Sequence, residues 1–193
     1  MKQKLKLALV GAGERGQYCY APYAKMHGYE IEFVAVADPH KGRREKFVQD
    51  YHVPAEGVFE TAEQFFARPR MADAVLICAQ DSQHYAYACQ AIDLGYSILL
   101  EKPISPSVRE CLDLQRRAEE KGTQIMVCHV MRYTKFYRKL KELIDSGVIG
   151  DVVHVTHTEN VAYWHYAHSY VRGNWRRAEE SSPMILAKSC HDM

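Results

Sequence analysis

Short apolar runs alternate with stretches of helical periodicity from the N-terminus to about residue 130. The apolar runs predict β-strands at 5–10, 31–37, near 58, and at 74–79, 97–100 and 124–128. Helices are predicted between them, at 16–26, 42–51, 62–67, 82–95 and 105–122. Strands that alternate with helices are typical of βαβ units and a parallel sheet. The pattern therefore predicts an α/β fold with a doubly wound parallel sheet.

The pattern changes after about residue 130. Residues 134–146 predict an amphipathic helix, and residues 151–161 alternate in the manner of a strand. Beyond Tyr163 the chain is dense in Tyr, Trp, His and Arg and loses regular periodicity. We therefore expect one domain over residues 1–130 and the start of a second, α+β domain over 131–193.

The composition narrows the class of protein. The chain has 193 residues, with 25 Lys and Arg against 24 Asp and Glu, so its formal net charge is +1. Proteins that bind nucleic acid or membrane surfaces normally carry a basic excess, so neither partner is expected. No apolar run reaches the length of about 18 residues that a membrane span needs. The short N-terminal run predicts a strand of a cytoplasmic protein and not a signal peptide.

A glycine-rich turn follows the first predicted strand. Residues 11–16 read G-A-G-E-R-G, a G-x-G-x-x-G pattern between a predicted strand and a predicted helix. The first glycine permits the tight turn, the second lets the backbone approach a pyrophosphate, and the third allows close helix–strand packing. The helix start then offers free N–H groups to phosphates. The spacing predicts a Rossmann-type dinucleotide site with the candidate cofactor residues Gly11, Gly13, Glu14, Arg15 and Gly16.

Asp38 strengthens this prediction and bears on which dinucleotide is bound. It lies 22 residues beyond Gly16, at the end of the second predicted strand, where a carboxylate can accept hydrogen bonds from a ribose 2′-OH. A carboxylate repels a 2′-phosphate, so Asp38 favours NAD. NADP stays open because Lys41, Arg43 and Arg44 follow closely and offer that phosphate a partner. Alternatively, these cations form the solvated first turn of the next helix.

A second chemical feature follows the strand predicted at 97–100. Glu101, Lys102 and Pro103 stand just beyond its carboxyl end, where ligands bind in open α/β sheets. Pro103 biases Lys102 towards extended backbone. A lysine beside a nicotinamide can hydrogen-bond a substrate hydroxyl and stabilise the alkoxide that develops as a hydride leaves. Lys102 is therefore a candidate catalytic residue, and Glu101 and Lys102 are both placed at the cofactor site; the alternative for Lys102 is a surface lysine after a strand.

The order of these motifs resembles that of the glucose–fructose oxidoreductase and inositol dehydrogenase (Gfo/Idh/MocA) family. The resemblance extends over essentially the whole chain and rests on residues 11–16, Asp38, residues 73–79 with His84, residues 101–103, 132–133 and 147–152. It implies a Rossmann domain followed by a domain with a large, mostly antiparallel sheet. It also implies NAD(P)-dependent oxidation or reduction at a sugar-like carbinol carbon. Members of this family are longer than this chain, so the resemblance implies that the sequence ends inside the second domain.

The resemblance also implies a general base near the end of the chain. His191 stands where the family has its catalytic histidine, and an imidazole suits proton removal from an alcohol near neutral pH. The family places an aspartate three residues earlier, whereas this chain has Lys188 there. If Lys188 lies near Lys102, neighbouring cations favour a neutral amine that can accept a proton. The alternative is a solvent-facing lysine on the last helix.

Two further sets of residues are candidates for binding. His84 follows the strand predicted at 74–79 and is placed on the nicotinamide side of the cofactor site; the alternative is packing at a helix start. Aromatic faces stack on sugar rings, and Arg and His bond hydroxyls, so the stretch after Tyr163 is a candidate sugar-binding wall. Its candidate substrate residues are Trp164, His165, Arg172 and Trp175. Alternatively, this stretch packs on the sheet of the second domain or on a partner subunit.

Together these features predict an NAD(P)-dependent oxidoreductase that moves a hydride between nicotinamide and a carbinol carbon of a sugar or polyol. A homo-oligomer is expected, because a lone strand at 151–161 would expose unpaired backbone groups. The rival function is a regulatory module that binds a dinucleotide and a partner without turnover, which Lys188 in place of the family aspartate favours. No metal is expected, since the nearest candidate ligands lack a paired thiolate motif: His165, His168, Cys190 and His191.

Overall fold

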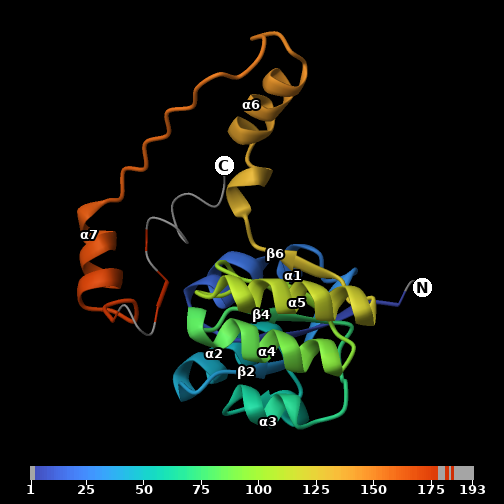
Figure 1. The fold of residues 1–193 in the computed structure, drawn as a ribbon. Coiled ribbons are helices and arrows are strands. Elements are labelled where there is room, and N and C mark those ends of the chain that lie inside the picture. The colour runs from blue at the N-terminus through green and yellow to red at the C-terminus, as the bar shows by residue number, and fades with distance from the viewer. Residues whose placement is uncertain (1–2, 178–180, 183, 185–193) are drawn as a thin grey trace. The chain divides into compact units, whose positions relative to one another are not determined.

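A computed structural model describes residues 3–177, 181, 182 and 184, and the chain divides into two compact units, Met1–Val127 and Cys128–Met193 (Figure 1). The first unit holds a parallel sheet in the order β3-β2-β1-β4-β5-β6. Its strands are β1 (Leu5–Val10), β2 (Ile31–Ala37), β3 (Val58–Phe59), β4 (Ala74–Ile77), β5 (Ser97–Leu100) and β6 (Ile125–Val127). The predicted doubly wound α/β fold is confirmed for this unit.

The connections of the sheet are helical. They are η1 (Glu14–Tyr20), α1 (Pro22–Met26), α2 (Lys41–Tyr51), η2 (Ala55–Gly57), α3 (Ala62–Phe66), α4 (Asp81–Asp93) and α5 (Val108–Lys121). The helix predicted at 16–26 is interrupted, because η1 is a π-helical segment that ends where the Ala21 N–H donates to Gly16 O at 3.0 Å. Figure 1 shows α4 and α5 side by side.

Alternate residues of each strand face two separate cores. Ala8 and Val10 of β1 belong to the core that α3, α4 and α5 complete with Phe65, Ala88 and Leu114. Leu7 and Leu9 of the same strand belong to the core that α1 and α2 complete with residues such as Ala24 and Phe47. A sheet covered on both faces needs strands that are mostly apolar, which is why the strands of this unit can be recognised in the sequence.

The parallel register brings the carboxyl ends of four strands to one edge of the sheet. Val10 of β1 pairs with Ala37 of β2 and with Ile77 of β4, and Ile77 pairs with Leu100 of β5. The segments that follow these four residues therefore leave the sheet side by side. These segments contain the glycine-rich turn, Asp38, the start of α4 and the Glu101–Lys102 turn.

Two helices begin at other residues than predicted. Helix α4 begins at Asp81 and not beyond Ser82. Its N-cap is Gln80, and the Gln80 N–H donates to the Gln83 side chain at 3.2 Å. Helix α5 begins at Val108 and not at Pro106. The Ser105 hydroxyl accepts the Ser107 N–H at 3.0 Å, and Ser107 instead supplies the capping oxygen for the helix.

The second unit contains η3 (Val130–Tyr133), α6 (Lys135–Asp145), α7 (Tyr163–Tyr166) and η4 (Ala167–Val171). The helix predicted at 134–146 is confirmed, with Thr134 as its N-cap. The strand predicted at 151–161 is wrong for the described structure. A strand requires a neighbour to accept and donate backbone hydrogen bonds, and no described residue of this unit provides one. Val153 is consequently 94% exposed.

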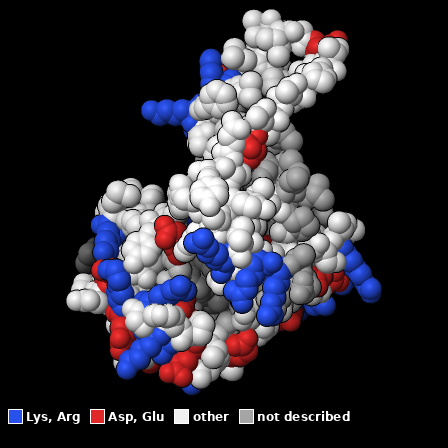
Figure 2. All heavy atoms as spheres, turned by 90° about the vertical axis from the view of Figure 1, so that its left-hand side faces the viewer, with Lys and Arg blue, Asp and Glu red and all other residues white. Residues whose placement is uncertain are grey.

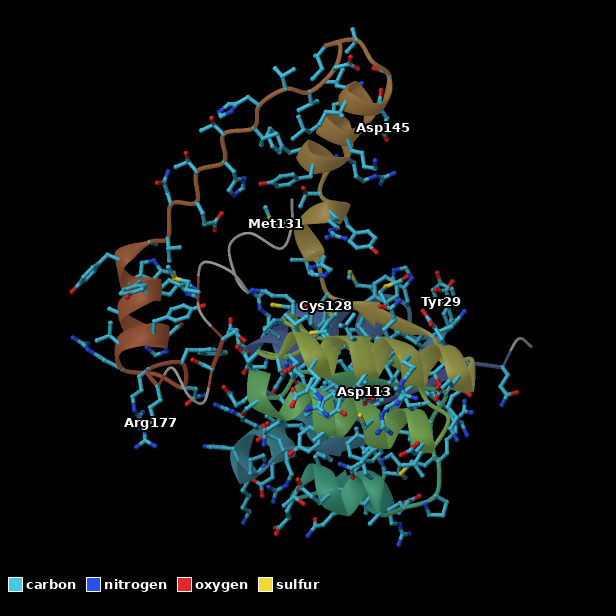
Figure 3. All side chains as sticks on the ribbon, viewed as in Figure 1. Tyr29, Asp113, Cys128, Met131, Asp145 and Arg177 are labelled. Atoms are coloured by element: carbon cyan, nitrogen blue, oxygen red, sulfur yellow. The ribbon has the colours of Figure 1, made fainter. Side chains whose placement is uncertain are left out.

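Charge is balanced over the molecule. On the face shown in Figure 2, Lys and Arg side chains in the lower part of the view are interspersed with Asp and Glu. A network of this kind joins α4 to α5 around Asp113, which Figure 3 labels. The Asp113 carboxylate accepts hydrogen bonds from Tyr85 Oη at 2.7 Å, Arg116 Nη2 at 2.7 Å and Arg117 Nε at 2.6 Å. No helix among the described residues is long and apolar enough to span a membrane.

Candidate functional site

The glycine-rich turn joins β1 to η1 at the carboxyl edge of the sheet. Gly11 has a φ of +94°, and its N–H donates to Ala37 O of β2 at 2.8 Å. A Cβ on Gly11 would lie 2.4 Å from Cys78 O, and a Cβ on Gly16 would lie 2.3 Å from Gly11 O. Only glycine fits at both positions, so the turn stays pressed against the ends of its neighbouring strands.

The middle glycine of the turn is open. A Cβ on Gly13 would have Nη1 of Arg43 as its nearest described neighbour, at 3.9 Å. The backbone at Gly13 therefore leaves room for a pyrophosphate to approach, as the motif requires. The turn fits the dinucleotide that such a motif binds.

Asp38 ties this turn to the end of β2. Its Oδ2 accepts the Ala12 N–H at 2.8 Å and its Oδ1 accepts the His40 N–H at 2.8 Å. The residue is only 3% exposed. The ribose contact predicted for Asp38 stays a prediction, whereas its two backbone contacts are a structural role that the sequence did not reveal.

The three cations that follow Asp38 have different surroundings. Lys41 is exposed and lies 3.7 Å from Glu45. Arg44 is buried; its Nη1 donates to Asp38 O at 2.7 Å and its Nη2 lies 3.1 Å from Glu60. Arg44 is thus a structural residue that holds the end of β2, and Arg43 is the one of these three cations whose side chain approaches Gly13.

Glu101 connects the glycine-rich turn to the candidate catalytic lysine. It follows β5 and is buried. Its Oε1 accepts the hydroxyl of Tyr20 and lies 3.9 Å from Arg15 Nε, and its Oε2 accepts the Lys102 N–H at 2.9 Å. One carboxylate therefore joins two residues of η1 to the backbone of Lys102.

The Glu101 carboxylate raises the pKa of Arg15. Burial by itself lowers the pKa of its guanidinium, but the charges of Glu101, Cys19 and Tyr20 outweigh burial and raise that pKa above its usual value. Tyr20 was not foreseen as a site residue. Nothing in the sequence distinguishes it from the other tyrosines, because its partner stands 81 residues away.

His84 lies inside α4 and is 1% exposed. Its Nδ1 is 2.7 Å from Pro103 O and its Nε2 is 3.1 Å from Ala79 O. Both ring nitrogens thus face carbonyl oxygens of the chain, one at the end of β4 and one in the Glu101–Pro103 turn. The cofactor contact predicted for His84 stays a prediction. In the structure the His84 ring contacts the backbone of the turn that contains Lys102.

The sheet register and these contacts gather the predicted cofactor residues at one edge of the first unit. A family model for an oxidoreductase family with an NAD-binding Rossmann fold, the Gfo/Idh/MocA family, matches residues 5–129. The chain belongs to this family. The resemblance seen in the motifs and the NAD-binding Rossmann fold are therefore confirmed.

Named relatives agree with this assignment. Inositol 2-dehydrogenase of Pseudomonas savastanoi pv. phaseolicola is 31% identical over 157 residues, which cover 79% of this chain and 46% of that protein. The scyllo-inositol 2-dehydrogenase (NADP(+)) IolW of Bacillus subtilis is 26% identical over 183 residues, 94% of this chain and 48% of that protein. This chain thus spans less than half the length of these Gfo/Idh/MocA relatives.

A solved structure shares the fold. The WlbA dehydrogenase of Bordetella pertussis, in complex with NADH and UDP-GlcNAcA, superposes with a TM-score of 0.69 at 20% identity. The match covers 77% of this chain and 44% of that one. The family model itself describes an NAD-binding Rossmann fold. The printed names of the similar proteins include NADP(+) for IolW and NADH for the WlbA complex.

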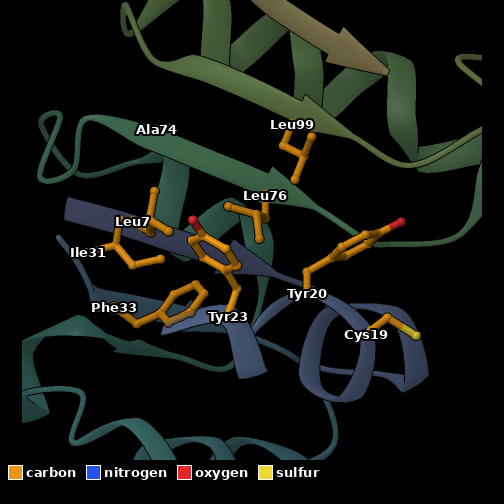
Figure 4. Close-up of a pocket in the computed structure, with 9 residues that line it drawn as sticks. All are labelled: Leu7, Cys19, Tyr20, Tyr23, Ile31, Phe33, Ala74, Leu76 and Leu99. Atoms are coloured by element: carbon orange, nitrogen blue, oxygen red, sulfur yellow. The ribbon is translucent and has the colours of Figure 1, made fainter. Parts of the chain in front are cut away.

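An apolar pocket of about 400 Å³ lies on one face of the same sheet (Figure 4). Its walls are strand residues and three residues of η1 and α1: Leu7, Ile31, Phe33, Ala74, Leu76, Leu99, Cys19, Tyr20 and Tyr23. The glycines, Asp38 and Lys102 are not among them. The ring of Tyr20 lines this pocket while its hydroxyl bonds Glu101, so the pocket adjoins the site without belonging to it.

The candidate substrate residues lie in the second unit. Trp164 and His165 of α7 are exposed and meet edge to face with ring centroids 5.6 Å apart. Arg172 is exposed, and Trp175 is half-buried against Tyr170 at 6.3 Å. The aromatic rings therefore cluster within this unit, while their sugar-binding role stays a prediction.

His191 and Lys188 lie outside the described residues. Within the part of the chain that the structure describes, no group of three or more His, Cys, Asp or Glu side chains is arranged to hold a metal.

Proposed function

We propose that this chain carries the cofactor domain of an NAD(P)-dependent dehydrogenase that acts on a CH–OH group of a sugar or polyol. The observation that carries the proposal is the attachment of Lys102 to the glycine-rich turn through Glu101. A lysine held next to a dinucleotide site at the carboxyl end of a parallel strand is placed to contact a reacting group. The polyol names of the relatives support the substrate class.

When bound, the nicotinamide supplies the carbon that accepts or donates the hydride. The residues of this chain perform the remaining tasks. The glycine-rich turn binds the diphosphate, and Glu101 fixes the backbone at which the Lys102 side chain begins. The Lys102 ammonium donates a hydrogen bond to the substrate hydroxyl and stabilises the negative charge that develops on its oxygen.

The proton of that hydroxyl requires an acceptor. We assign this role to His191 on the strength of the family position that it occupies, with Lys188 as the neighbouring cation. Trp164, His165, Arg172 and Trp175 supply aromatic faces and hydrogen-bond donors of the kind that hold a polyol.

Reduction of NAD or NADP at the nicotinamide absorbance, over a panel of inositols, other polyols and sugars, tests the proposal in the full-length protein. At least one member of the panel should be oxidised. Lys102→Ala should lower turnover by about 10²–10³, the usual cost of losing one charged transition-state donor, and leave dinucleotide affinity nearly unchanged.

Two results would count against the proposal. Near-normal turnover of Lys102→Ala would remove this lysine from the chemistry. Tight dinucleotide binding without oxidation of any compound would favour the regulatory module that binds a dinucleotide without turnover.

A further inference from the structure

The backbone of Lys102 is held from both sides. On the side of β5, the Glu101 N–H donates to Ile77 O at 2.9 Å, and the Lys102 N–H donates to Glu101 Oε2 at 2.9 Å. On the other side stands Pro103, which has no N–H, so its carbonyl oxygen is the only main-chain group through which it can form a hydrogen bond. Nδ1 of His84 lies 2.7 Å from that oxygen. The point at which the Lys102 side chain begins therefore depends on His84 as well as on Glu101.

The His84 ring is fixed at both of its nitrogens. It lies near the start of α4, and the residue is 1% exposed. Nε2 lies 3.1 Å from Ala79 O, in the segment that follows β4, while Nδ1 faces the turn that follows β5. Strands β4 and β5 are paired neighbours in the sheet. One buried ring thus joins the end of one strand to the lysine turn after the next, and contacts at both nitrogens hold its orientation.

The two ring contacts are not equivalent. A neutral imidazole carries one N–H and donates to one of the two carbonyl oxygens, and both oxygens receive a hydrogen bond only when both nitrogens carry protons. The contact with Pro103 O is the shorter, 2.7 Å against 3.1 Å for Ala79 O. The shorter distance favours a proton on Nδ1, directed at the turn that contains Lys102.

We propose that His84 is a positioning residue for Lys102, because its Nδ1–H holds the Pro103 carbonyl and so fixes where the lysine stands relative to the dinucleotide site. This role rests on the proposed function, in which Lys102 contacts the substrate hydroxyl. It needs no contact of His84 with cofactor or substrate. Misplacing a catalytic group by about 1 Å can cost about a hundredfold in rate, so a hydrogen bond one residue away from the lysine has a measurable effect.

Two substitutions at this position separate the two ring contacts. The amide nitrogen of asparagine is bonded to Cγ, as Nδ1 of histidine is, whereas the amide nitrogen of glutamine lies one bond further out, as Nε2 does. His84→Asn can therefore keep the hydrogen bond to Pro103 O, and His84→Gln can keep the one to Ala79 O. Each variant retains one donor at the same buried position, so each is the control for the other.

Turnover of the full-length protein with the polyol that it oxidises tests the proposal. His84→Gln should lower kcat by about tenfold to a hundredfold and change the KM for the dinucleotide by less than about twofold, whereas His84→Asn should keep kcat within about threefold. Tyr87→Phe is a control for stability, since it removes a buried hydroxyl of α4 that bonds Glu63 at 3.1 Å and leaves the lysine turn intact. It should lower the unfolding temperature and leave kcat unchanged.

Hydrogen exchange of the Lys102 amide in the same full-length variants is a readout that needs no turnover. Exchange should be faster in His84→Gln than in the wild type and nearly unchanged in His84→Asn. Equal kcat and equal exchange in the two variants would overturn the proposal, and a raised dinucleotide KM at unchanged kcat would place His84 on the cofactor instead. If the wild type oxidises no polyol, the proposed function fails, while the exchange pattern still supports or overturns the hold of His84 on the lysine turn.

Discussion

The hydroxyl of Tyr20 donates a hydrogen bond to the carboxylate of Glu101, a residue 81 positions further along the chain. Glu101 also accepts the Lys102 N–H at 2.9 Å and lies 3.9 Å from Arg15. The cofactor turn after β1 and the lysine turn after β5 are therefore one connected structure.

Tyr20→Phe should destabilise the first unit by about 1–3 kcal/mol, because the buried Glu101 carboxylate loses one of its donors. Chemical denaturation measures this change. Tyr23→Phe is the control, since Tyr23 lines the same apolar pocket and its hydroxyl forms no hydrogen bond to a described residue. An equal loss in both variants would show that the hydroxyl bond to Glu101 contributes nothing.

His84→Ala should lower the free energy of unfolding by about 2–4 kcal/mol, since it removes the ring N–H available to the carbonyl oxygens of Pro103 and Ala79 and opens a cavity. His84→Gln keeps an amide that can donate and should lose less. Unfolding in urea compares the two. A change below about 0.5 kcal/mol in His84→Ala would mean that the Pro103 turn is held by other contacts.

The stability of the first unit should depend on pH through Asp113. Hydrogen bonds from Tyr85, Arg116 and Arg117 hold the pKa of Asp113 well below its ordinary value. A carboxylate whose pKa is lower in the folded state stabilises the fold fully above its unfolded value of about 4 and loses that contribution as pH falls towards the folded value. Asp113→Asn should therefore flatten the acid side of the curve of unfolding free energy against pH.

The hydrogen bond between Tyr85 and Asp113 should also make stability fall at high pH. The hydrogen bond to Asp113 and burial raise the pKa of Tyr85 to about 12, so its contribution is complete below about 10 and is lost as pH rises towards 12. Tyr85→Phe should remove this alkaline loss. Glu120→Gln is a control for the acid and the alkaline side of the curve, because it removes an exposed partner of Arg116 and leaves Asp113 in place. Identical pH profiles in all three variants would contradict the roles given to Asp113 and Tyr85.

Residues 151–161 should promote self-association. Val153 is 94% and Val155 69% exposed, and the backbone between them has no described strand partner, which favours pairing with a second chain. Light scattering at several concentrations should show a dimer or larger species. Val153→Lys combined with Val155→Lys should shift the chain towards monomer, because like charges face each other across paired strands. A monomer at every concentration in the wild type would refute this expectation.

The sequence alone determined the sheet and the family. The strands at 31–37 and 97–100 were predicted at their observed limits, because strands covered on both faces of a parallel sheet are mostly apolar. The glycine-rich turn was readable because its conformation and close contacts exclude any side chain at Gly11 and Gly16. Constraints of this kind act within a short segment, so they can be recognised from consecutive residues.

Other features depended on contacts between distant residues. The pairing of Tyr20 with Glu101 joins segments whose separation in the sequence carries no pattern, and the spacing that singled out Asp38 did not show that its carboxylate accepts the Ala12 N–H. The strand predicted at 151–161 was wrong for the same reason, since alternation of side chains describes one strand but cannot supply the neighbour that completes its hydrogen bonds.

The surroundings of each charged group were decided by the tertiary structure as well. In the sequence Lys41, Arg43 and Arg44 are equivalent cations beyond Asp38. In the structure Lys41 forms an exposed ion pair, the Arg43 guanidinium is exposed beside Gly13, and Arg44 is a buried structural residue. Residue type fixes the charge of a side chain, but its direction and its partners are set by the packing of α2 against the sheet, which no local pattern contains.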